Sequence, residues 1–451
     1  MLRAQRSFPI RPSLFATAAL CLPAAVTLAP AAHASEVRVN TLSRPAGIDD
    51  ETSTFTYPSL VNRYSLAVAE FGTSADQEAY AAAFTQTSFG SIGVAFSRDQ
   101  SAFNYLNAAT GAQNDNDFIT SHFARYSFAR KFSSTFGVTP QRPLDLFYGL
   151  PLGTDQGFGL RLTLAGDTNE VTDTAKTVKK NATQFDLAGG YHMPVATGRV
   201  DIGLSLGLVG NLNDTTSPKS GPKTERTYER GLSARASARW VEIQATVAKP
   251  YMKTAIEWSQ PRVASDAGGV SASKKAKDLA FDVQGGAIVS PTERVSLNGG
   301  LGAFFLQSEG PFTLSAPKGT AIDTAIRNGT EIVTANLAGP RATRTAYGVA
   351  LNGGAEALVT DSVGVLAGVN YMVWGRISTK NKAAADEPKY STNLPETADA
   401  DLWSLGAYVK RDAFRFDAAT AFKRFIHNGA YFVTGKATDN MVAQFAASYR
   451  F

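Results

Sequence analysis

Apolar and polar residues alternate with a period of two in many stretches of this sequence. In one stretch, Val200, Ile202, Leu204, Leu206 and Leu208 alternate with residues that are mostly small or polar. Successive side chains of a β-strand point to opposite faces, so this pattern predicts a strand with one apolar face. The same alternation recurs at 158–165, 295–305, 347–352 and 363–371. The chain is therefore predicted to be all-β.

Such segments give sixteen candidate strands. Fourteen is the alternative, because the first two segments are short and Pro250 interrupts a weak region at 249–258. Many segments are about ten residues long, the length that a tilted strand needs to cross a bilayer. The candidates lie near 63–71, 79–87, 90–98, 144–152, 157–167, 182–193, 199–211, 229–240, 241–250, 276–290, 294–307, 344–359, 363–375, 402–412, 414–425 and 441–451.

The connections between these segments alternate between short and long. Short gaps lie at 412–413, 360–362, 291–293 and 194–198, and long polar connections lie at 427–440, 376–401, 308–343, 259–275 and 212–228. Membrane barrels have tight turns on the periplasmic rim and longer loops on the extracellular rim. The sequence thus predicts an antiparallel transmembrane β-barrel of about 14 to 16 strands, with short periplasmic turns and long extracellular loops.

The first 34 residues have a different character from the rest. Three arginines and no acidic residue precede an apolar run from Leu14 to Leu28, and the small-residue site Ala32-His33-Ala34 follows. This layout predicts a cleavable signal peptide at residues 1–34. Its removal leaves 41 basic against 39 acidic residues, a net charge of +2, and takes away Cys21, the only cysteine. Such a chain holds no disulfide, and its charge gives no reason to expect a nucleic-acid partner.

The remainder has no apolar run of about 18 residues, so it does not cross a bilayer as a helix. A barrel is expected over residues 61–451, because only helices and closed barrels satisfy every backbone polar group in hydrocarbon. Residues 35–60 lack strand periodicity and are either a periplasmic lead-in or a plug inside the lumen. Residues 118–132 fit one helical face, whereas 124–129 would also fit a strand, which would make the strand count odd.

The chain ends on an aromatic residue at the close of the last predicted strand. Phe445, Tyr449 and Phe451 share one face of this strand with Ala443 and Ala447. This end closely resembles the C-terminal signature of Gram-negative outer-membrane β-barrel proteins. The resemblance implies that Phe445, Tyr449 and Phe451 form an assembly signal for the barrel-assembly machinery. It also implies a location in the cell outer membrane, in contact with outer-membrane lipid, after export.

A second resemblance lies just after the predicted signal peptide. The segments Val37–Leu42, Asp49–Glu51 and Phe55–Pro58 look like the opening of barrels related to long-chain fatty-acid transporters. That family implies a fourteen-strand barrel, often with an N-terminal segment inside the lumen, that moves hydrophobic compounds. The count of sixteen departs from this pattern, and no substrate-contacting residue is carried over.

The strand faces opposite the lipid-facing ones would line the lumen. They carry charges of both signs, which either form a selectivity constriction or pair with one another across a polar interior. The alternating run Ser233-Arg235-Ser237-Arg239 is the best candidate for a basic stripe. The predicted lumen-lining residues are Arg161, Asp186, Asp201, Arg235, Arg239, Asp282, Glu356, Arg415 and Asp417, together with His192 and Lys423.

Aromatic residues near the ends of the predicted strands are expected to form interfacial girdles, where amphipathic rings favour the lipid headgroups. The alternative is that some of them face the lumen and contact a ligand. The residues concerned are Tyr191, Tyr371, Trp374, Trp403, Tyr408, Phe414 and Tyr449.

Catalysis is not expected from this sequence, and no cofactor is implied. His122, His192 and His427 are the histidines that follow the predicted signal peptide, and none stands in a nucleophile motif or at metal-ligand spacing. The leading expectation is an outer-membrane channel or transporter for passive uptake of small or hydrophobic molecules. The alternative is a non-conducting surface receptor, adhesin or structural anchor. The oligomeric state is left open.

Overall fold

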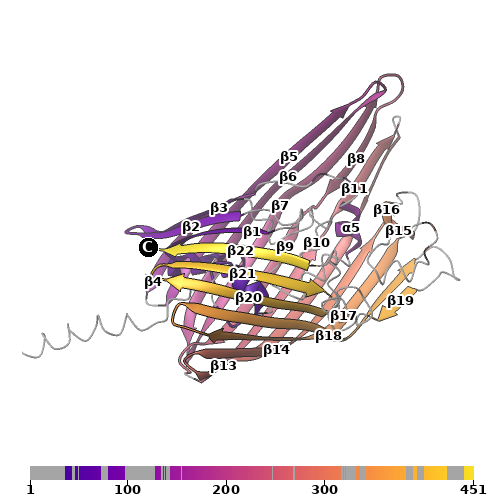
Figure 1. The fold of residues 1–451 in the computed structure, drawn as a ribbon. Coiled ribbons are helices and arrows are strands. Elements are labelled where there is room, and N and C mark those ends of the chain that lie inside the picture. Colours follow the sequence, from indigo (N-terminus) through magenta and orange to yellow (C-terminus); the bar gives the residue numbers. More distant parts are fainter. Residues whose placement is uncertain are drawn as a thin grey trace, which may run out of the picture. The chain divides into compact units, whose positions relative to one another are not determined.

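Sixteen antiparallel strands close into a β-barrel in the computed structural model of the protein (Figure 1). Within this ring each strand pairs with its neighbours in chain order, and the ring closes where β1 (Leu66–Gly72) pairs with β22 (Met441–Arg450). The prediction of sixteen strands is therefore confirmed, and the alternative of fourteen is wrong. A closed ring has no sheet edge, which is the condition for a sheet to cross hydrocarbon.

The other fourteen ring strands run in order around the wall. The structure describes residues 36–42, 46–48, 50–72, 80–96, 127–133, 136, 138, 143–153, 155–245, 247–267, 270–315, 318, 320, 332–335, 337, 341–381, 390–393, 401–423 and 441–451. The strands are β2 (Tyr80–Thr87), β3 (Gly90–Phe96), β4 (Leu144–Gly153), β5 (Gln156–Thr172), β6 (Lys176–Val195), β7 (Gly198–Pro218), β9 (Ser233–Glu242), β10 (Ala248–Ser259), β13 (Lys277–Thr292), β14 (Val295–Gly310), β17 (Ala342–Leu358), β18 (Val363–Asn381), β20 (Asp401–Arg411) and β21 (Phe414–Lys423).

Further short elements lie inside the ring or continue its strands. Among the described residues, no helix is long and apolar enough to span a membrane. The additional strands are β8 (Thr224–Glu229), β11 (Arg262–Ala267), β12 (Val270–Lys275), the hairpin of β15 (Phe312–Ser315) with β16 (Ile332–Ala335), and β19 (Tyr390–Asn393). The helical elements are α2 (Glu36–Thr41), α3 (Ser53–Thr56), the 3-10 helix η1 (Pro58–Arg63) and α5 (Phe128–Ser133).

The two rims of the barrel differ in the length of their connections. On one rim, here the turn rim, strands join through short turns such as 196–197, 293–294 and 412–413. On the opposite rim, the loop rim, the connections include 311–341, 382–400 and 424–440. The outward faces between the rims carry exposed apolar side chains such as Ile202, Leu204 and Leu301. An apolar belt on a closed barrel is the exterior of a membrane-spanning protein.

Three expectations about local structure are wrong. The ninth strand was expected at 241–250 but is β10, Ala248–Ser259, and Pro250 is tolerated because it lies near the start of the strand, before pairing with β9 begins at Tyr251. The connections at 212–228 and 259–275 are not loops, since they contain the end of β7 and strands β8, β11 and β12. Their polar side chains lie mainly on the outer face of these strands, whereas Leu212, Tyr228 and Val263 are buried on the inner face.

The ambiguous region before β4 contains a helix where the structure describes it. Residues Phe128–Ser133 form α5, so the strand alternative is wrong for these residues, and the even strand count stands. Residues 118–126 lie outside the described residues.

Barrel closure depends on the strand that the C-terminus provides. Seven residue pairs join β1 to β22, and the N–H of Phe451 donates to the carbonyl of Ser65 at 3.2 Å. Phe445 stacks on Phe71 across the seam, with ring centroids 5.3 Å apart, and on Phe416 on its other side at 6.3 Å. Tyr449 and Phe451 are exposed on the same outward face. Their recognition by the assembly machinery stays a prediction.

Replacing Phe445 tests the contribution of these rings to closure. Phe445→Ala should lower the free energy of unfolding by about 0.5–1.5 kcal/mol for each lost ring pair, beyond the loss of area alone. Urea unfolding in phospholipid vesicles, followed by tryptophan fluorescence, measures the difference. Phe281→Ala, at a lipid-facing phenylalanine of β13, is the control. Equal destabilisation by the two substitutions would show that stacking at the seam contributes nothing specific.

Candidate functional site

The described residues of the N-terminal segment, 36–42, 46–48 and 50–63, contact the inner wall of the barrel, and this segment is called the plug below. Helix η1 contacts β3, β4, β5 and β6, and α2 contacts β18, β20, β21 and β22 on the other side of the lumen. Leu60, Val61 and Ser59 are fully buried. The choice between a periplasmic lead-in and a lumen plug for residues 35–60 stays a prediction.

The wall beneath the plug carries a row of glycines at one level. Gly149, Gly159, Gly190 and Gly203 are aligned in register across β4, β5, β6 and β7. A Cβ on Gly190 would lie 2.8 Å from the Pro58 nitrogen, and a Cβ on Gly203 would collide with the Thr56 carbonyl oxygen. The plug backbone therefore approaches the wall at a distance that a side chain would prevent. This half of the plug is fitted to the barrel by shape.

Aromatic side chains fill the space between this half of the plug and strands β1–β4. The ring of Phe55 meets Phe147 edge-on at 5.2 Å, and Phe147 meets Phe84 in the same way at 5.4 Å. The Tyr64 ring lies 6.4 Å from Phe84. These residues belong to one buried cluster with Leu60. The apolar contact adds hydrophobic burial to the close backbone fit.

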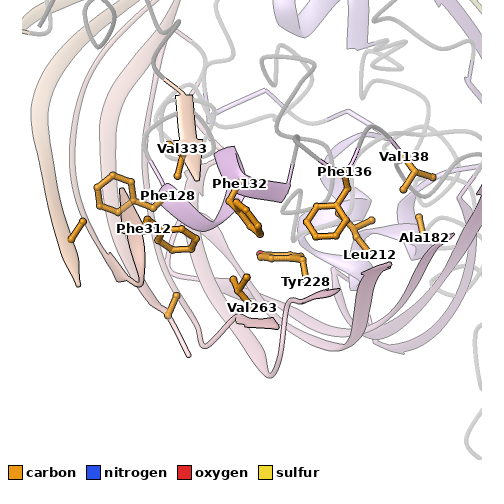
Figure 2. Packing of buried hydrophobic residues seen from close by; sticks show 12 residues of the cluster. Phe128, Phe132, Phe136, Val138, Ala182, Leu212, Tyr228, Val263, Phe312 and Val333 are labelled. Carbon is orange, nitrogen blue, oxygen red and sulfur yellow. The ribbon is translucent and has the colours of Figure 1, made fainter. Parts of the chain in front are cut away.

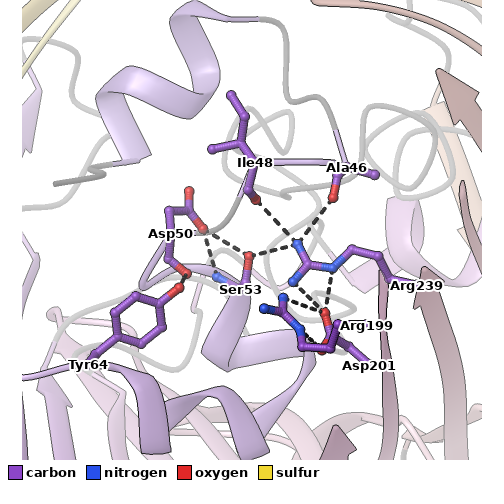
Figure 3. A network of polar contacts seen from close by, with 8 residues as sticks. All are labelled: Ala46, Ile48, Asp50, Ser53, Tyr64, Arg199, Asp201 and Arg239. Atoms are coloured by element: carbon purple, nitrogen blue, oxygen red, sulfur yellow. Dashed lines mark hydrogen bonds and ion pairs between the residues drawn. The ribbon is translucent and has the colours of Figure 1, made fainter. Parts of the chain in front are cut away.

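Arg239 holds the middle of the plug through a polar network (Figure 3). Its guanidinium donates to the carbonyls of Ala46 and Ile48 at 3.1 and 3.3 Å, and its other nitrogens bind Asp201 at 2.6 and 2.9 Å. Arg199 donates to the same carboxylate at 2.6 and 3.0 Å. Asp201 thus orients two arginines, one of which reaches the plug backbone.

The opposite half of the plug combines apolar packing of Leu42 against Leu366 and Tyr408 with an ion network. Arg38 of α2 donates twice to Glu356, at 2.6 and 3.1 Å, and Glu356 lies 4.0 Å from Arg415. Arg415 also binds Asp417 at 2.7 Å, and its guanidinium lies 3.7 Å from the centroid of the Tyr408 ring. The contact is therefore an ion network of Arg38 with three wall residues. Tyr408, expected in an interfacial girdle, instead faces the lumen under Arg415.

The surroundings of Arg38 and Tyr57 fix the protonation state of each side chain. Burial alone disfavours the Arg38 cation, but Glu356 outweighs it, so the pKa of Arg38 is raised above its usual value. Burial also raises the pKa of the Tyr57 phenol, against the opposing charge of Arg239, whose guanidinium lies 5.1 Å from the Tyr57 ring centroid. Arg38 therefore stays charged and Tyr57 stays neutral across the physiological range.

The remaining predicted lumen residues lie on the inner wall with partners of their own. Arg161 donates to the Phe55 carbonyl at 2.6 Å and lies 3.7 Å from Asp145. Asp186 accepts from Arg230 at 2.5 Å, and Arg235 lies 3.9 Å from Glu257.

Asp282 and His192 are also buried, whereas the side chain of Lys423 lies outside the described residues. The nine predicted charges thus do not gather into one ring. Arg161, Arg239 and Glu356 contact the plug, and Asp201, Arg415 and Asp417 support those contacts.

Several residues of this arrangement gave no signal in the sequence. Arg38, Arg199, Arg230 and Asp145 were not predicted, although Arg199, Arg230 and Asp145 are fully buried. Arg38 lies in a segment without strand periodicity, and Arg230 lies in a predicted strand but at a break between β8 and β9. The glycine row could not be recognised before the register was known, because its members are far apart in sequence.

A second buried layer packs against the inner wall toward the loop rim. Phe128 and Phe132 of α5, with Phe136, pack against Phe312, Tyr228 and neighbouring apolar residues (Figure 2). The Ser127 hydroxyl donates to Asp278 at 2.6 Å, and the Phe128 N–H donates to Ser308 at 3.0 Å. This aromatic layer is therefore tied to the inner wall by hydrogen bonds as well as by packing.

The described part of the lumen contains no group of three or more His, Cys, Asp or Glu side chains that could hold a metal ion. His122 and His427 lie outside the described residues. The arrangement consists of the plug and the aromatic layer, each packed against the inner wall, together with paired charges on that wall. Such a site can admit, hold or exclude a solute.

No protein-family model matches the sequence, and no curated protein matches it. Solved outer-membrane barrels resemble it in structure. A FadL homologue from Pseudomonas aeruginosa is 12% identical, with 92% of this chain and 98% of that chain covered at a TM-score of 0.37. The ferric-catecholate import receptor Fiu from Escherichia coli K12 is 8% identical, with coverage of 86% and 81% and a TM-score of 0.35.

The TodX monoaromatic hydrocarbon channel, in a mutant form, is 7% identical, with coverage of 89% and 94% and a TM-score of 0.31. At TM-scores this low, the activities of these proteins are not transferred to this chain.

The glycine row can be tested with neighbouring residues of β6. Gly190→Ala should displace the plug, because the added methyl meets plug backbone, and overpacking of this kind costs about 1–3 kcal/mol. A Ser59→Cys background reports the displacement through its rate of reaction with a water-soluble maleimide. The rate should rise by about tenfold, in proportion to the population of displaced plug.

Gly189→Ala is the matched control, since its Cβ would meet no atom closer than 3.8 Å. Unchanged maleimide reactivity in Gly190→Ala would show that the plug is not seated on the glycine row.

Proposed function

We propose that this protein is a gated outer-membrane transporter for passive uptake of small or hydrophobic molecules, with the plug as its closing element. The observation that carries the proposal is the unequal attachment of the plug. One half fits a glycine row and an aromatic cluster, whereas the α2 half adds the Arg38–Glu356 ion pair to the packing of Leu42. A segment held in this way can be released at one end while it stays seated at the other.

The two layers of the lumen support the solute class. The layer near the loop rim is aromatic and apolar, which suits contact with a hydrophobic solute. Below it, the paired charges of Arg235 with Glu257 and of Arg230 with Asp186 line the wall. A small solute with both apolar and polar groups would find partners in each layer. Transport is passive in this proposal, because the solute moves down its own gradient once the plug is displaced.

Conductance in planar bilayers tests the proposal. The wild-type barrel should be closed for most of the time. Glu356→Gln should raise the open probability by at least about tenfold, because it removes the charge that binds Arg38 in a partly buried ion pair and so weakens the attachment of α2.

Asp361→Asn is the control. Asp361 lies in the turn of the same β17–β18 hairpin, and the substitution breaks an exposed ion pair with Arg294 at 2.9 Å. A variant without residues 36–48 should conduct continuously. If that deletion folds and remains silent, the barrel is not a gated transporter, and a non-conducting receptor, adhesin or anchor becomes the better description. A wild-type barrel that is steadily open would equally contradict the role of the plug.

A further inference from the structure

Three consecutive ring strands extend far beyond the apolar belt. β6 has 20 residues and β7 has 21, about twice what a tilted strand needs to cross a bilayer. On the outward face of β7, the apolar series Ile202, Leu204, Leu206 and Leu208 gives way to polar side chains from Asn211 onward. The outward face of β5 changes in the same way after Leu164. The part of these strands beyond the change therefore stands above the hydrocarbon, on the loop rim.

β8, β11 and β12 complete a six-stranded sheet there, visible where β5 to β8 and β11 rise above the wall (Figure 1). β7 pairs with β8, β8 with β11 and β11 with β12. Each of these short strands continues a ring strand across a break, at Gly231, Pro261 or Ala276. The extension sheet is defined here as residues 166–183, 211–229 and 262–275.

The outer face of the extension sheet is polar in every aligned row. The first row above the apolar belt contains Thr183, Asn211, Glu229, Arg262 and Lys275. The second row contains Thr168, Asn181, Asn213, Thr227, Ala264 and Ser273. These rows form a flat surface of hydroxyl, amide and charged groups, with one methyl at Ala264.

The inner face of the same sheet is covered. Leu212, Tyr228 and Val263 are buried against the aromatic layer that contains Phe132 and Phe136. The Phe132 and Phe136 rings each lie 6.5 Å from the Tyr228 ring. The packed inner face holds the sheet in place, so the outer face is the one available to a partner.

Cations gather where the outer face meets the apolar belt. Lys277 lies just beyond the outward pair Trp258 and Leu279, and Arg262 is paired in register with Lys275 in the row above. Arg262 also lies 3.6 Å from Glu229 and donates to Ser273 at 2.7 Å. Three cations on adjacent strands, at the edge of the hydrocarbon, are placed for phosphate groups attached to a lipid.

We propose that the outer face of the extension sheet binds the phosphorylated saccharide headgroup of an outer-leaflet glycolipid. Arg262, Lys275 and Lys277 contact the phosphates, and the threonine and asparagine rows above them contact sugar hydroxyls. The order of groups away from the membrane is the same on both sides. The phosphates of the headgroup lie next to the acyl chains, at the level of the three cations, and its sugars lie farther out, at the level of the threonine and asparagine rows. The proposal rests on the outer-membrane location in the proposed function, but it does not depend on transport.

Binding of purified lipopolysaccharide to the full-length folded barrel in detergent tests this surface. The triple variant Arg262→Gln, Lys275→Gln and Lys277→Gln should bind lipopolysaccharide at least about tenfold more weakly. A matched variant with Lys176→Gln, Lys219→Gln and Lys223→Gln removes the same charge from the far tip of the sheet and should bind as the wild type does. Heat-modifiable migration on gels confirms that each variant is folded.

A second pair of measurements separates sugar recognition from general attraction to anionic lipid. Asn181→Ala with Asn213→Ala should weaken binding of lipopolysaccharide but leave binding of phosphatidylglycerol vesicles unchanged. Equal weakening of lipopolysaccharide binding by the two triple variants would overturn the proposal in favour of charge attraction alone. Equal loss of binding to both lipids in the double asparagine variant would do the same. If the wild-type protein is a dimer in detergent and the Arg262, Lys275 and Lys277 triple variant is a monomer, the face is instead an interface between copies of this chain. Conductance is measured separately, so failure of gating leaves this result unaffected.

Discussion

Every other feature of this protein depends on the hydrogen-bonded closure of β1 against β22. In hydrocarbon an unpaired backbone N–H or C=O costs several kcal/mol, so the sheet must return to its first strand. The closed ring turns one face of each strand toward lipid and the other toward an enclosed space. Only because that space is enclosed can Arg239 and Arg161 be buried at the wall and donate to carbonyls of the plug.

The plug combines two kinds of attachment that respond differently to perturbation. The contact of Thr56 and Pro58 with Gly203 and Gly190 depends on shape, and it is insensitive to charge. The contact of Arg38 with Glu356 depends on charge, and it is weakened by any group that competes for either partner.

The sequence was sufficient for the barrel and for the inward side of several charged residues, because both follow from alternation with a period of two. Arg235, Arg239, Asp201 and Asp417 were assigned to the inner face on that ground alone, and the structure places them there. The sequence was not sufficient to predict which side chains contact one another across strands, because the strand register decides those contacts. Gly159 and Gly190 form one row only after β5 and β6 are aligned.

The strand extensions were missed because the polar residues of 212–228 and 259–275 resemble loops when no apolar face marks them. Tyr408 was misplaced for a related reason. An aromatic residue near a strand end fits an interfacial girdle, but Arg415 on the neighbouring strand provides a cationic partner on the inner side. The contact with Arg415 on the neighbouring strand thus outweighed the preference of the Tyr408 side chain for the membrane interface.

The join between the plug and the wall has a kinetic consequence. η1 ends at Arg63 and β1 begins at Leu66, so two residues separate the plug from the barrel. A displaced plug cannot diffuse away, and its return is an intramolecular step whose effective concentration is set by this short tether rather than by the amount of protein. Each barrel therefore recloses independently of its neighbours, at a rate that crowding in the membrane does not change.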